Sequence, residues 1–265
     1  MDGGYTTKGF KMSKAYLRRR QKILHYLQDT PEASVSELVK LCAVSPATVR
    51  RDLLEMKSEG LLVRTFGGAR CATQQSLLLR TFEQRSMLQH KQKMAIAAAA
   101  AELIEPGMTI AIDSGTTCWH FSAQLKQQEK WPLRIVTSAL AVIETLGSVE
   151  GMEIHLIGGR FRVSNLDFCG PMSASGFSNF HVDAAILGCD AFTPQNGAFS
   201  LDLDSVAISQ AMIQCSDKRI LLCDDSKIGK KSGYRLLALP ELDCLVTNRA
   251  IKTLAQAPYQ VIIAK

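Results

Sequence analysis

The sequence predicts a two-domain protein, in which a small helical domain precedes a larger α/β domain with a mainly parallel sheet. The chain has 265 residues, which fits two domains of ordinary size better than one. Its excess positive charge lies in residues 1–70, where 13 Lys and Arg stand against 7 Asp and Glu, whereas residues 71–265 carry 18 of each. From residue 94 onward, short apolar runs alternate with helical patterns. That alternation is typical of a parallel sheet covered on both faces.

The bulk composition excludes several classes of protein. With 46% hydrophobic and 21% charged residues, the chain reads as folded and globular. The longest apolar run, 94–104, is too short to cross a bilayer, and no secretory leader is visible, so a cytoplasmic location without a membrane partner is expected. The eight cysteines have neither metal-ligand spacing nor the pattern of a disulfide framework. No metal and no cofactor are therefore expected.

The first domain is predicted over residues 16–70, after a disordered leader at 1–15. A first helix is predicted over 16–28 and a second, shorter one follows the break at 29–33, because apolar residues recur on one helical face in each. A third helix follows Ser45, which is a good N-cap, and begins with Pro46, the residue favoured at the first helical position. The two apolar faces comprise Tyr16, Ile23, Leu24 and Leu27 in the first helix and Val35, Leu38, Leu41 and Cys42 in the second.

The third helix has the character of a DNA-reading helix. Val49, Leu53 and Met56 recur at i, i+4 and i+7, so they are expected to face the core. Hydroxyl and guanidinium groups remain at its outer N-terminal end, and Arg can bond a guanine edge or a phosphate in two places. A helix-turn-helix is therefore predicted over about 34–53, followed by a β-wing over 60–69. The predicted DNA-binding residues are Ser45, Pro46, Ala47, Thr48, Arg50, Arg51 and, on the wing, Arg64.

The alternative is an ordinary three-helix packing module, in which Arg50 and Arg51 form only a solvated face. Against it, the segment VSELVKLCAVSPATVRRDLLEMKSEGLLVRTFGGA resembles the N-terminal domain of the DeoR family of bacterial transcription regulators over about 35 residues without a gap. The family hallmark is V-S-x-x-T-[IV]-R-R-D-L followed by G-x-[LI]-x-R-x-H-G-G-A. Phe66 stands in place of the usual His, which affects a wing contact, and Ala43 replaces a common turn glycine, which is a minor change. The resemblance implies a winged helix-turn-helix that binds a double-stranded DNA operator.

Residues 71–93 are predicted to be a linker with some helix, because they are polar and contain few turn-forming residues. The segment TFEQR and the Lys that follows it resemble the connector of the same family. The matching residues are Arg85 and Lys93. They either tie the two domains together or are surface charges, and the sequence leaves both possibilities open.

Residues 94–265 predict the larger, Rossmann-like domain. Helical patterns at 94–104, 118–128, 140–148, 172–180 and 203–216 precede strand patterns at 109–113, 134–138, 153–159, 182–190 and 218–227, and two further strands, 243–247 and 260–264, finish the chain. In such sheets ligands bind outside the carboxyl ends of the strands. Polar and small residues gather at five of these ends. Each cluster alone is ordinary turn chemistry, but together they favour a ligand site.

The segment DSGTT at 113–117 follows the first strand and opens a helix. Hydroxyls and backbone N–H groups at a helix N-terminus can hold a phosphate, and Lys227 can supply a compensating cation. The predicted effector-binding residues are Asp113, Ser114, Gly115, Thr116, Thr117, Thr137, Ser138, Gly158, Gly159, Gly188, Asp190, Asp202 and Lys227.

The larger domain also resembles the DeoR-family sensor domain, which is similar in fold to ribose-5-phosphate isomerases. The motifs D-x-G-T-T, GG, G-P, G-x-D and D-x-S-K-x-G occur in family order. The resemblance implies a phosphorylated sugar as effector, with residues 114–117 and Lys227 at the phosphate and Asp113, Asp190 and Asp202 toward the carbon chain. The chain departs from the family at 137–139, which read Thr-Ser-Ala in place of Thr-Asn-Ser, and lacks a Glu near the start of the helix after Gly197.

These features favour a ligand-responsive regulator over an enzyme. An aldose–ketose isomerase needs a carboxylate base, which in the isomerases is a Glu after a glycine-rich loop. Here residues 194–205, PQNGAFSLDLDS, offer only Asp and one glycine. An isomerase-like enzyme with an added DNA-binding domain stays the alternative, because Asp can also act as a base. We expect a homodimer or homotetramer that represses carbohydrate-metabolism genes and is not an enzyme, with operator binding modulated by a phosphorylated sugar.

Overall fold

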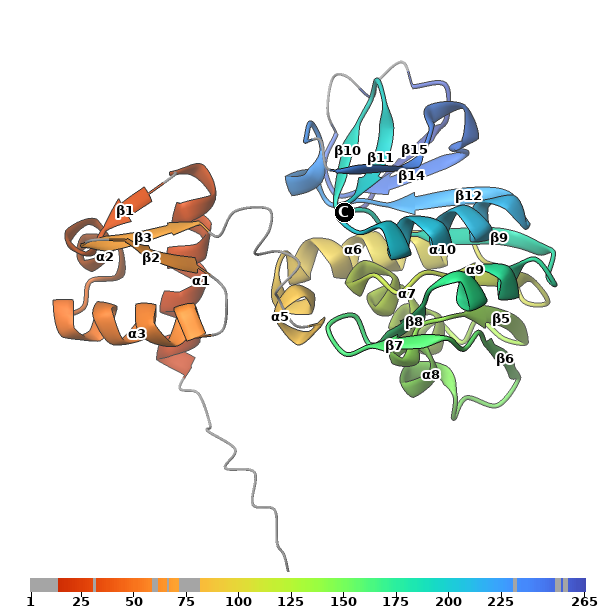
Figure 1. Ribbon diagram of the computed structural model, residues 1–265, viewed down its shortest axis with the longest axis horizontal. Helices are drawn as coiled ribbons and strands as arrows, with labels where there is room; N and C mark the ends of the chain where they lie inside the picture. The colour runs from red at the N-terminus through yellow and green to blue at the C-terminus, as the bar shows by residue number, and fades with distance from the viewer. Residues whose placement is uncertain are drawn as a thin grey trace, which may run out of the picture. The chain divides into compact units, whose positions relative to one another are not determined.

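The computed structural model describes residues 14–30, 32–58, 62–65, 67–71, 82–230, 233–250, 254 and 257–265. The chain divides into two units, Met1–Arg80 and Thr81–Lys265 (Figure 1). The predicted leader, 1–15, lies outside the described residues except for its last two, which begin the first helix. Among the described helices, none has both the length and the apolar character that crossing a membrane requires.

Among its described residues, the first unit contains three helices and a small antiparallel sheet, as predicted for a winged helix. The helices are α1 (Lys14–Asp29), α2 (Val35–Cys42) and α3 (Pro46–Ser58), and the strands are β1 (Glu32–Ser34), β2 (Leu62–Thr65) and β3 (Gly68–Cys71), in the order β1-β3-β2. Ile23, Leu38, Val49 and Leu53 are fully buried in a core that all three helices share. The helix periodicity therefore identified the correct inward faces.

The turn between α2 and α3 differs from the sequence-based expectation at one residue. Ala43 ends α2 with φ 53° and ψ 46°, which is the left-handed region. A residue with a Cβ adopts this conformation at a cost of about 1 kcal/mol, and glycine avoids that cost. Having Ala43 in place of the common glycine therefore also costs conformational free energy at this turn.

The second unit is built on a seven-stranded parallel sheet, so the mainly parallel α/β prediction is confirmed. Its strands lie in the order β15-β14-β12-β9-β4-β5-β6. Their bounds are β4 (Thr109–Ile112), β5 (Leu133–Thr137), β6 (Met152–Leu156), β9 (Val182–Leu187), β12 (Ser216–Leu222), β14 (Cys244–Thr247) and β15 (Gln260–Ile263).

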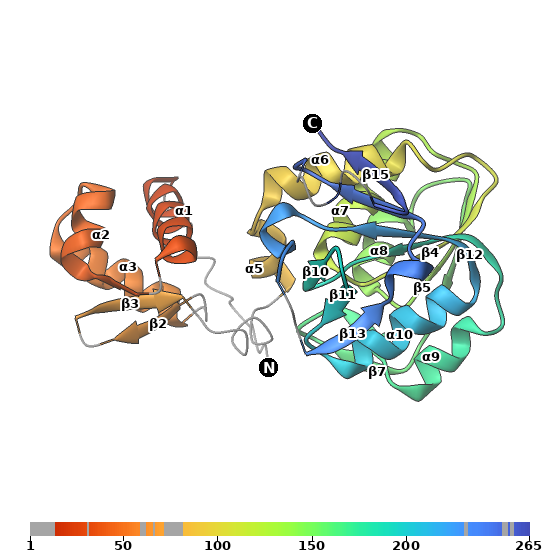
Figure 2. The ribbon, with the colours of Figure 1, turned by 90° about the horizontal axis from the view of Figure 1, so that it is seen from above.

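Helices cover both faces of this sheet (Figure 2). Alternate strand residues supply the two layers, so that Ile110 and Ile112 pack with one set of helices and Ala111 with the other. On the first face lie α6 (His90–Ala101), α7 (Thr116–Gln127) and α8 (Leu140–Leu146), and on the second lie α9 (Pro171–Phe177) and α10 (Leu203–Gln214).

Several elements were not predicted from the sequence. They are the hairpin β7 (Arg160–Arg162) and β8 (Asp167–Cys169), the antiparallel sheet of β10 (Ala191–Thr193), β11 (Gly197–Ser200) and β13 (Tyr234–Leu237), and the 3₁₀ turns η1 (Asp225–Lys227) and η2 (Leu239–Glu241). The strands among them are only three or four residues long, too short for a clear alternation. The helix α5 (Phe82–Met87) lies in the segment that was predicted to be a linker with some helix. Residues 82–93, taken as part of the linker, lie in the second unit.

The strand order defines a switch point. From β4 the chain continues to β5 and β6 on one side, and from β9 it continues to β12, β14 and β15 on the other side. β4 and β9 are hydrogen-bonded neighbours, with Ile112 paired to Ile186. Ligands of doubly wound sheets bind in the crevice at the carboxyl ends of such a strand pair.

Candidate functional site

In the first unit, the turn before α3 presents its predicted residues to solvent. The Ser45 hydroxyl accepts from the backbone N–H of Thr48 at 3.2 Å and lies 2.9 Å from its side-chain oxygen. Ser45, Pro46 and Ala47 are exposed, and Thr48 is half-buried. The N-terminal end of α3 is therefore capped and open to a partner.

The two adjacent arginines lie on the outer side of the same helix. Arg50 and Arg51 are both exposed, whereas Val49 and Leu53 beside them are fully buried. On the wing, Arg64 is half-buried and its Nε has no acceptor among the described residues. Phe66 lies outside those residues, so its departure from the family His has no structural account.

An ion pair that was not predicted fixes the orientation of α3. Arg19 on α1 donates from Nε to Asp52 Oδ2 at 2.6 Å and from Nη2 to Asp52 Oδ1 at 3.0 Å. The carboxylate raises the pKa of Arg19 through this hydrogen bond. The sequence held a signal, because Asp52 follows Val49 by three positions on the apolar face, and a buried carboxylate requires a partner.

In the second unit, Asp113 links the ends of β4 and β9. Its Oδ1 accepts from Ser114 N at 2.7 Å and its Oδ2 from Gly188 N at 3.1 Å, while the Ser209 hydroxyl lies 3.5 Å from Oδ2. The residue is 7% exposed, and burial raises the pKa of its carboxyl to about 6. The structure thus brings the predicted residues Asp113 and Gly188 together at the switch point.

The loop Ser114–Thr117 leads into α7. Its last two residues are the first two of α7. The N-cap of α7 is Gly115, which has no side chain to accept from the N–H groups of the first turn. Such N–H groups and the helix dipole attract anions. Thr116 and Thr117 are buried and Ser114 is half-buried. An anion site at this end of the helix stays a prediction.

Two lysines approach this loop region from other elements. Lys93 is 4% exposed, and its Nζ donates to Thr116 Oγ1 at 2.9 Å. Lys227 donates to the carbonyl oxygen of Cys189 at 2.6 Å, in the residue after Gly188. Burial opposes the charge of Lys227, but nearby carboxylates, chiefly that of Asp224, raise the pKa of its ammonium group. Lys93 was not predicted as a site residue, although the family-like connector pointed to it.

The next strand end contributes Thr137 and Ser138, with different environments. Thr137 Oγ1 donates to Ile112 O at 2.6 Å and accepts from Ala139 N at 3.0 Å, so it is engaged within the sheet edge. Ser138 is 1% exposed, and its hydroxyl has no partner among the described residues. A buried hydroxyl without a hydrogen-bond partner costs folding free energy. Ser138 directly follows β5, the strand that pairs with β4.

Gly158, Gly159 and Asp190, three further predicted residues, make local contacts at their strand ends. Gly159 packs against α9, because a Cβ there would lie 2.0 Å from Ser173 Oγ, whereas Gly158 has open space. Asp190 accepts from Ser200 Oγ at 3.1 Å and from Leu201 N at 2.9 Å. These contacts hold the loops at the strand ends, and a ligand role for the three residues stays a prediction.

Asp202 caps α10 and pairs with a residue that was not predicted. It accepts from Ser205 N at 3.0 Å and forms an ion pair with Arg162, which also donates to Asp167 Oδ1 at 2.9 Å. Burial opposes ionisation of Asp202, but the bonds from Ser205 and the charge of Arg162 lower its pKa. Arg162 therefore joins the β7–β8 hairpin to the start of α10.

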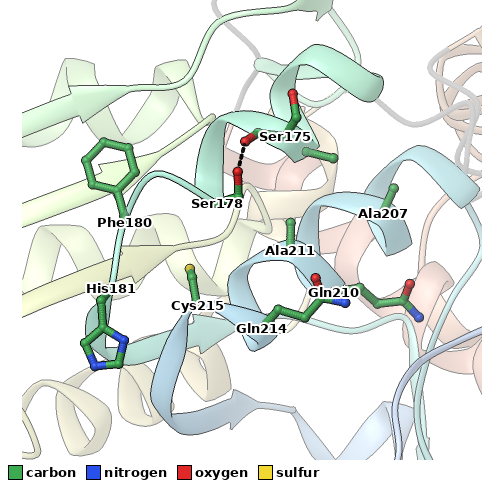
Figure 3. Close-up of a pocket in the computed structure, with 10 residues that line it drawn as sticks. Ser175, Ser178, Phe180, His181, Ala207, Gln210, Ala211, Gln214 and Cys215 are labelled. Carbon is green, nitrogen blue, oxygen red and sulfur yellow. Dashed lines mark hydrogen bonds between the residues drawn. The ribbon is translucent and has the colours of Figure 1, made fainter.

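A groove of about 630 Å³ lies elsewhere, between α9 and α10 (Figure 3). Ser178 from the end of α9 and Gln210 and Gln214 from α10 line it, together with His181. None of the predicted effector-binding residues lines this groove. Among the described residues, no cluster of His, Cys, Asp or Glu has the geometry to hold a metal ion.

Comparison with known proteins identifies the class of both units. Residues 19–75 match the profile of the DeoR-like helix-turn-helix domain, and residues 88–249 match that of the DeoR C terminal sensor domain. The chain belongs to the DeoR family. The predicted resemblance is confirmed, and so is the prediction of a DNA-binding transcription regulator.

This DeoR-family chain matches curated transcription regulators over most of their length. The lactose phosphotransferase system repressor of Lactococcus lactis is 30% identical, covering 88% of this chain and 91% of that protein. The transcriptional repressor GlcR of Bacillus subtilis is 28% identical, covering 86% of each chain. The L-fucose operon activator of Haemophilus influenzae is 26% identical, covering 88% of this chain and 92% of that protein.

Solved structures show a lower degree of likeness. Ribose 5-phosphate isomerase A from Methanocaldococcus jannaschii aligns with a TM-score of 0.40 and 16% identity, covering 54% of this chain and 56% of that one. The Pyrococcus horikoshii translation initiation factor eIF-2B aligns with a TM-score of 0.45 and 11% identity, covering 90% of each. Likeness of this degree indicates neither ligand nor activity.

Proposed function

We propose that this regulator represses carbohydrate-metabolism genes and that a phosphorylated sugar modulates its affinity for operator DNA. The observation that carries the proposal is the Ser114–Thr117 loop, which opens α7 at the switch point without a side-chain cap. Buried Lys93 lies 2.9 Å from its Thr116 hydroxyl, and a lysine beside uncapped N–H groups is a favourable environment for a phosphate. Two of the relatives named above are repressors and two carry sugars in their names, which supports the choice of genes.

The DNA-binding surface of the proposal is the exposed end of α3 with Arg50 and Arg51. Both side chains are exposed on the side opposite the buried core residues, as an approach to the major groove requires. The assembly is proposed to be a homodimer or homotetramer, because two DNA-binding domains on symmetric half-sites combine contacts that are individually weak. Analytical ultracentrifugation of the full chain measures this directly, and a purely monomeric protein on a palindromic operator would contradict it.

The effector part is tested by a thermal-shift screen of phosphorylated sugars, with each unphosphorylated sugar as its matched control. A binding phosphorylated sugar raises the melting temperature in a concentration-dependent way, and its parent sugar does not. Operator affinity is then measured with and without each hit, and the ligand is recovered for chemical analysis. Recovery of an isomerised sugar would instead favour the enzyme alternative, and a panel without any hit would remove the proposed effector class.

A further inference from the structure

The groove between α9 and α10 lies on the outer side of both helices (Figure 3). The buried residues of α10 pack toward the sheet, and its exposed residues recur at intervals of four, three and four positions, so they form one row along the helix. The row consists of Leu203, Ala207, Gln210 and Gln214. Ser175 of α9 and Ser178, which follows that helix, are exposed on the other side of the groove. We refer to these residues, together with Met172 of α9, as the α9–α10 surface.

The two segments that form this surface carry almost no charge. Residues 171–181 and 205–216 contain no Asp, Glu, Lys or Arg, although 21% of the whole chain is charged. The outer side of a surface helix ordinarily carries charged residues, because water solvates them well. The centre of a protein–protein interface is depleted in charged residues. The composition of the α9–α10 surface is therefore more typical of an interface than of two helices that face water.

Large apolar side chains are exposed at the first turns of both helices. Met172 of α9 is 77% exposed, and Leu203 of α10 is 58% exposed. The two turns lie side by side, because Cys169 Sγ, two residues before α9, lies 3.6 Å from Asp204 Oδ2 in α10. Apolar residues that gather in one exposed patch mark interaction sites, whereas single exposed ones are ordinary. An apolar patch thus adjoins the uncharged groove.

The chemistry of this surface selects a second copy of the chain as its partner. Nucleic acids and anionic membranes are bound through Lys and Arg, which the surface lacks. A contact between two copies usually has two-fold symmetry, which places each residue near the axis beside its own counterpart. A charged residue there would meet a like charge. The amides of Gln210 and Gln214 hold both a donor and an acceptor, so each can pair with its copy.

We infer that two copies of this chain associate through the α9–α10 surface, with Gln210, in the middle of the exposed row, near the two-fold axis. This inference rests on the proposed function, because it takes the regulator to be a homo-oligomer. In the assembly, the exposed row of each α10 packs into the groove of the other copy, as ridges of one helix pack into grooves of another. Met172 and Leu203 lose their exposure to water in the same contact, which supplies an apolar driving force.

Sedimentation velocity of the full chain over a range of concentrations tests the inference. Gln210→Arg places two like charges near the axis, so the dissociation constant of the oligomer should rise by about tenfold or more. Gln127→Arg is the matched control, because Gln127 is also an exposed helical glutamine but ends α7, on the first face of the sheet. This control should leave the dissociation constant unchanged. The measurement requires neither DNA nor effector, so it is independent of the operator and effector parts of the proposed function.

The outcomes separate the interface from the assembly. A wild-type oligomer that Gln210→Arg leaves intact, or that Gln127→Arg weakens equally, overturns the inference while the proposed homo-oligomer stands. A wild type that sediments only as a monomer removes the homo-oligomer and the interface with it. If circular dichroism shows that Gln210→Arg does not fold, Leu203→Glu takes its place, because an acid at the first turn of a helix is favourable. An oligomer that Leu203→Glu leaves intact then overturns the inference.

Discussion

Replacing Asp113 with asparagine is expected to change how the stability of the second unit depends on pH. The carboxyl is buried between Ser114 N and Gly188 N, and burial raises its pKa from the ordinary 3.8 to about 6. Because the folded pKa lies above the unfolded one, protonated Asp113 adds stability that is fully present below the unfolded pKa. That stability is lost as the pH rises through the folded pKa.

The size of the effect follows from the two pKa values. Raising the pKa of a carboxyl from 3.8 to about 6 corresponds to about 3 kcal/mol of unfolding free energy. About 2 kcal/mol of this is lost between about pH 4 and about pH 7. Asparagine does not titrate, so Asp113→Asn should gain this amount over the wild type as the pH rises across that range. The substitution also weakens one hydrogen bond, but that cost is nearly independent of pH and cancels in the comparison.

Urea unfolding measured through tryptophan fluorescence is the suitable assay, because both tryptophans, Trp119 and Trp131, belong to the second unit. Wild type and Asp113→Asn are compared at several pH values, and the quantity of interest is the difference between their free energies of unfolding. A difference that stays constant within about 0.5 kcal/mol, or that moves in favour of the wild type with rising pH, would refute the reasoning.

Four further changes test other parts of the structure. Alanine at both Arg50 and Arg51 is expected to weaken operator binding by about tenfold or more and to reduce the slope of affinity against salt by about two, as titrations at several salt concentrations would show; an unchanged slope would contradict a DNA contact. Ala43→Gly should raise the unfolding free energy of the first unit by up to about 1 kcal/mol in a circular-dichroism melt, because it relieves a left-handed residue. Gly159→Ala should destabilise the second unit by about 1–3 kcal/mol, since its methyl group would lie 2.0 Å from a serine hydroxyl, while Gly158→Ala, with open space, is the control and should change little. Arg19→Met should cost about 3 kcal/mol by leaving a buried carboxylate unpaired, and adding Asp52→Leu should recover most of the loss; no recovery would mean that packing, and not charge, holds α1 to α3.

The features that were predictable depend on residues close together in the chain. Ser45 and Pro46 mark the start of α3, and the spacing of Val49 and Leu53 marks its buried side, because capping and helical periodicity are local properties. In the same way, the DSGTT segment predicted the strand-to-helix turn between β4 and α7. The two units and the class of regulator follow from such local patterns, charge distribution and family motifs.

The tertiary structure decided which of the predicted strand ends meet. Asp113 bonds to Gly188, 75 positions away, because β4 pairs with β9, and nothing in two short apolar strands specifies that they are neighbours. Lys93 reaches the Thr116 hydroxyl only because α6 packs beside α7, whereas its sequence surroundings read as an ordinary polar segment. Local patterns determine where a strand ends, but backbone hydrogen bonds and burial across the whole sheet determine its neighbours. Which residues meet at the carboxyl ends of the strands is therefore a property of the fold.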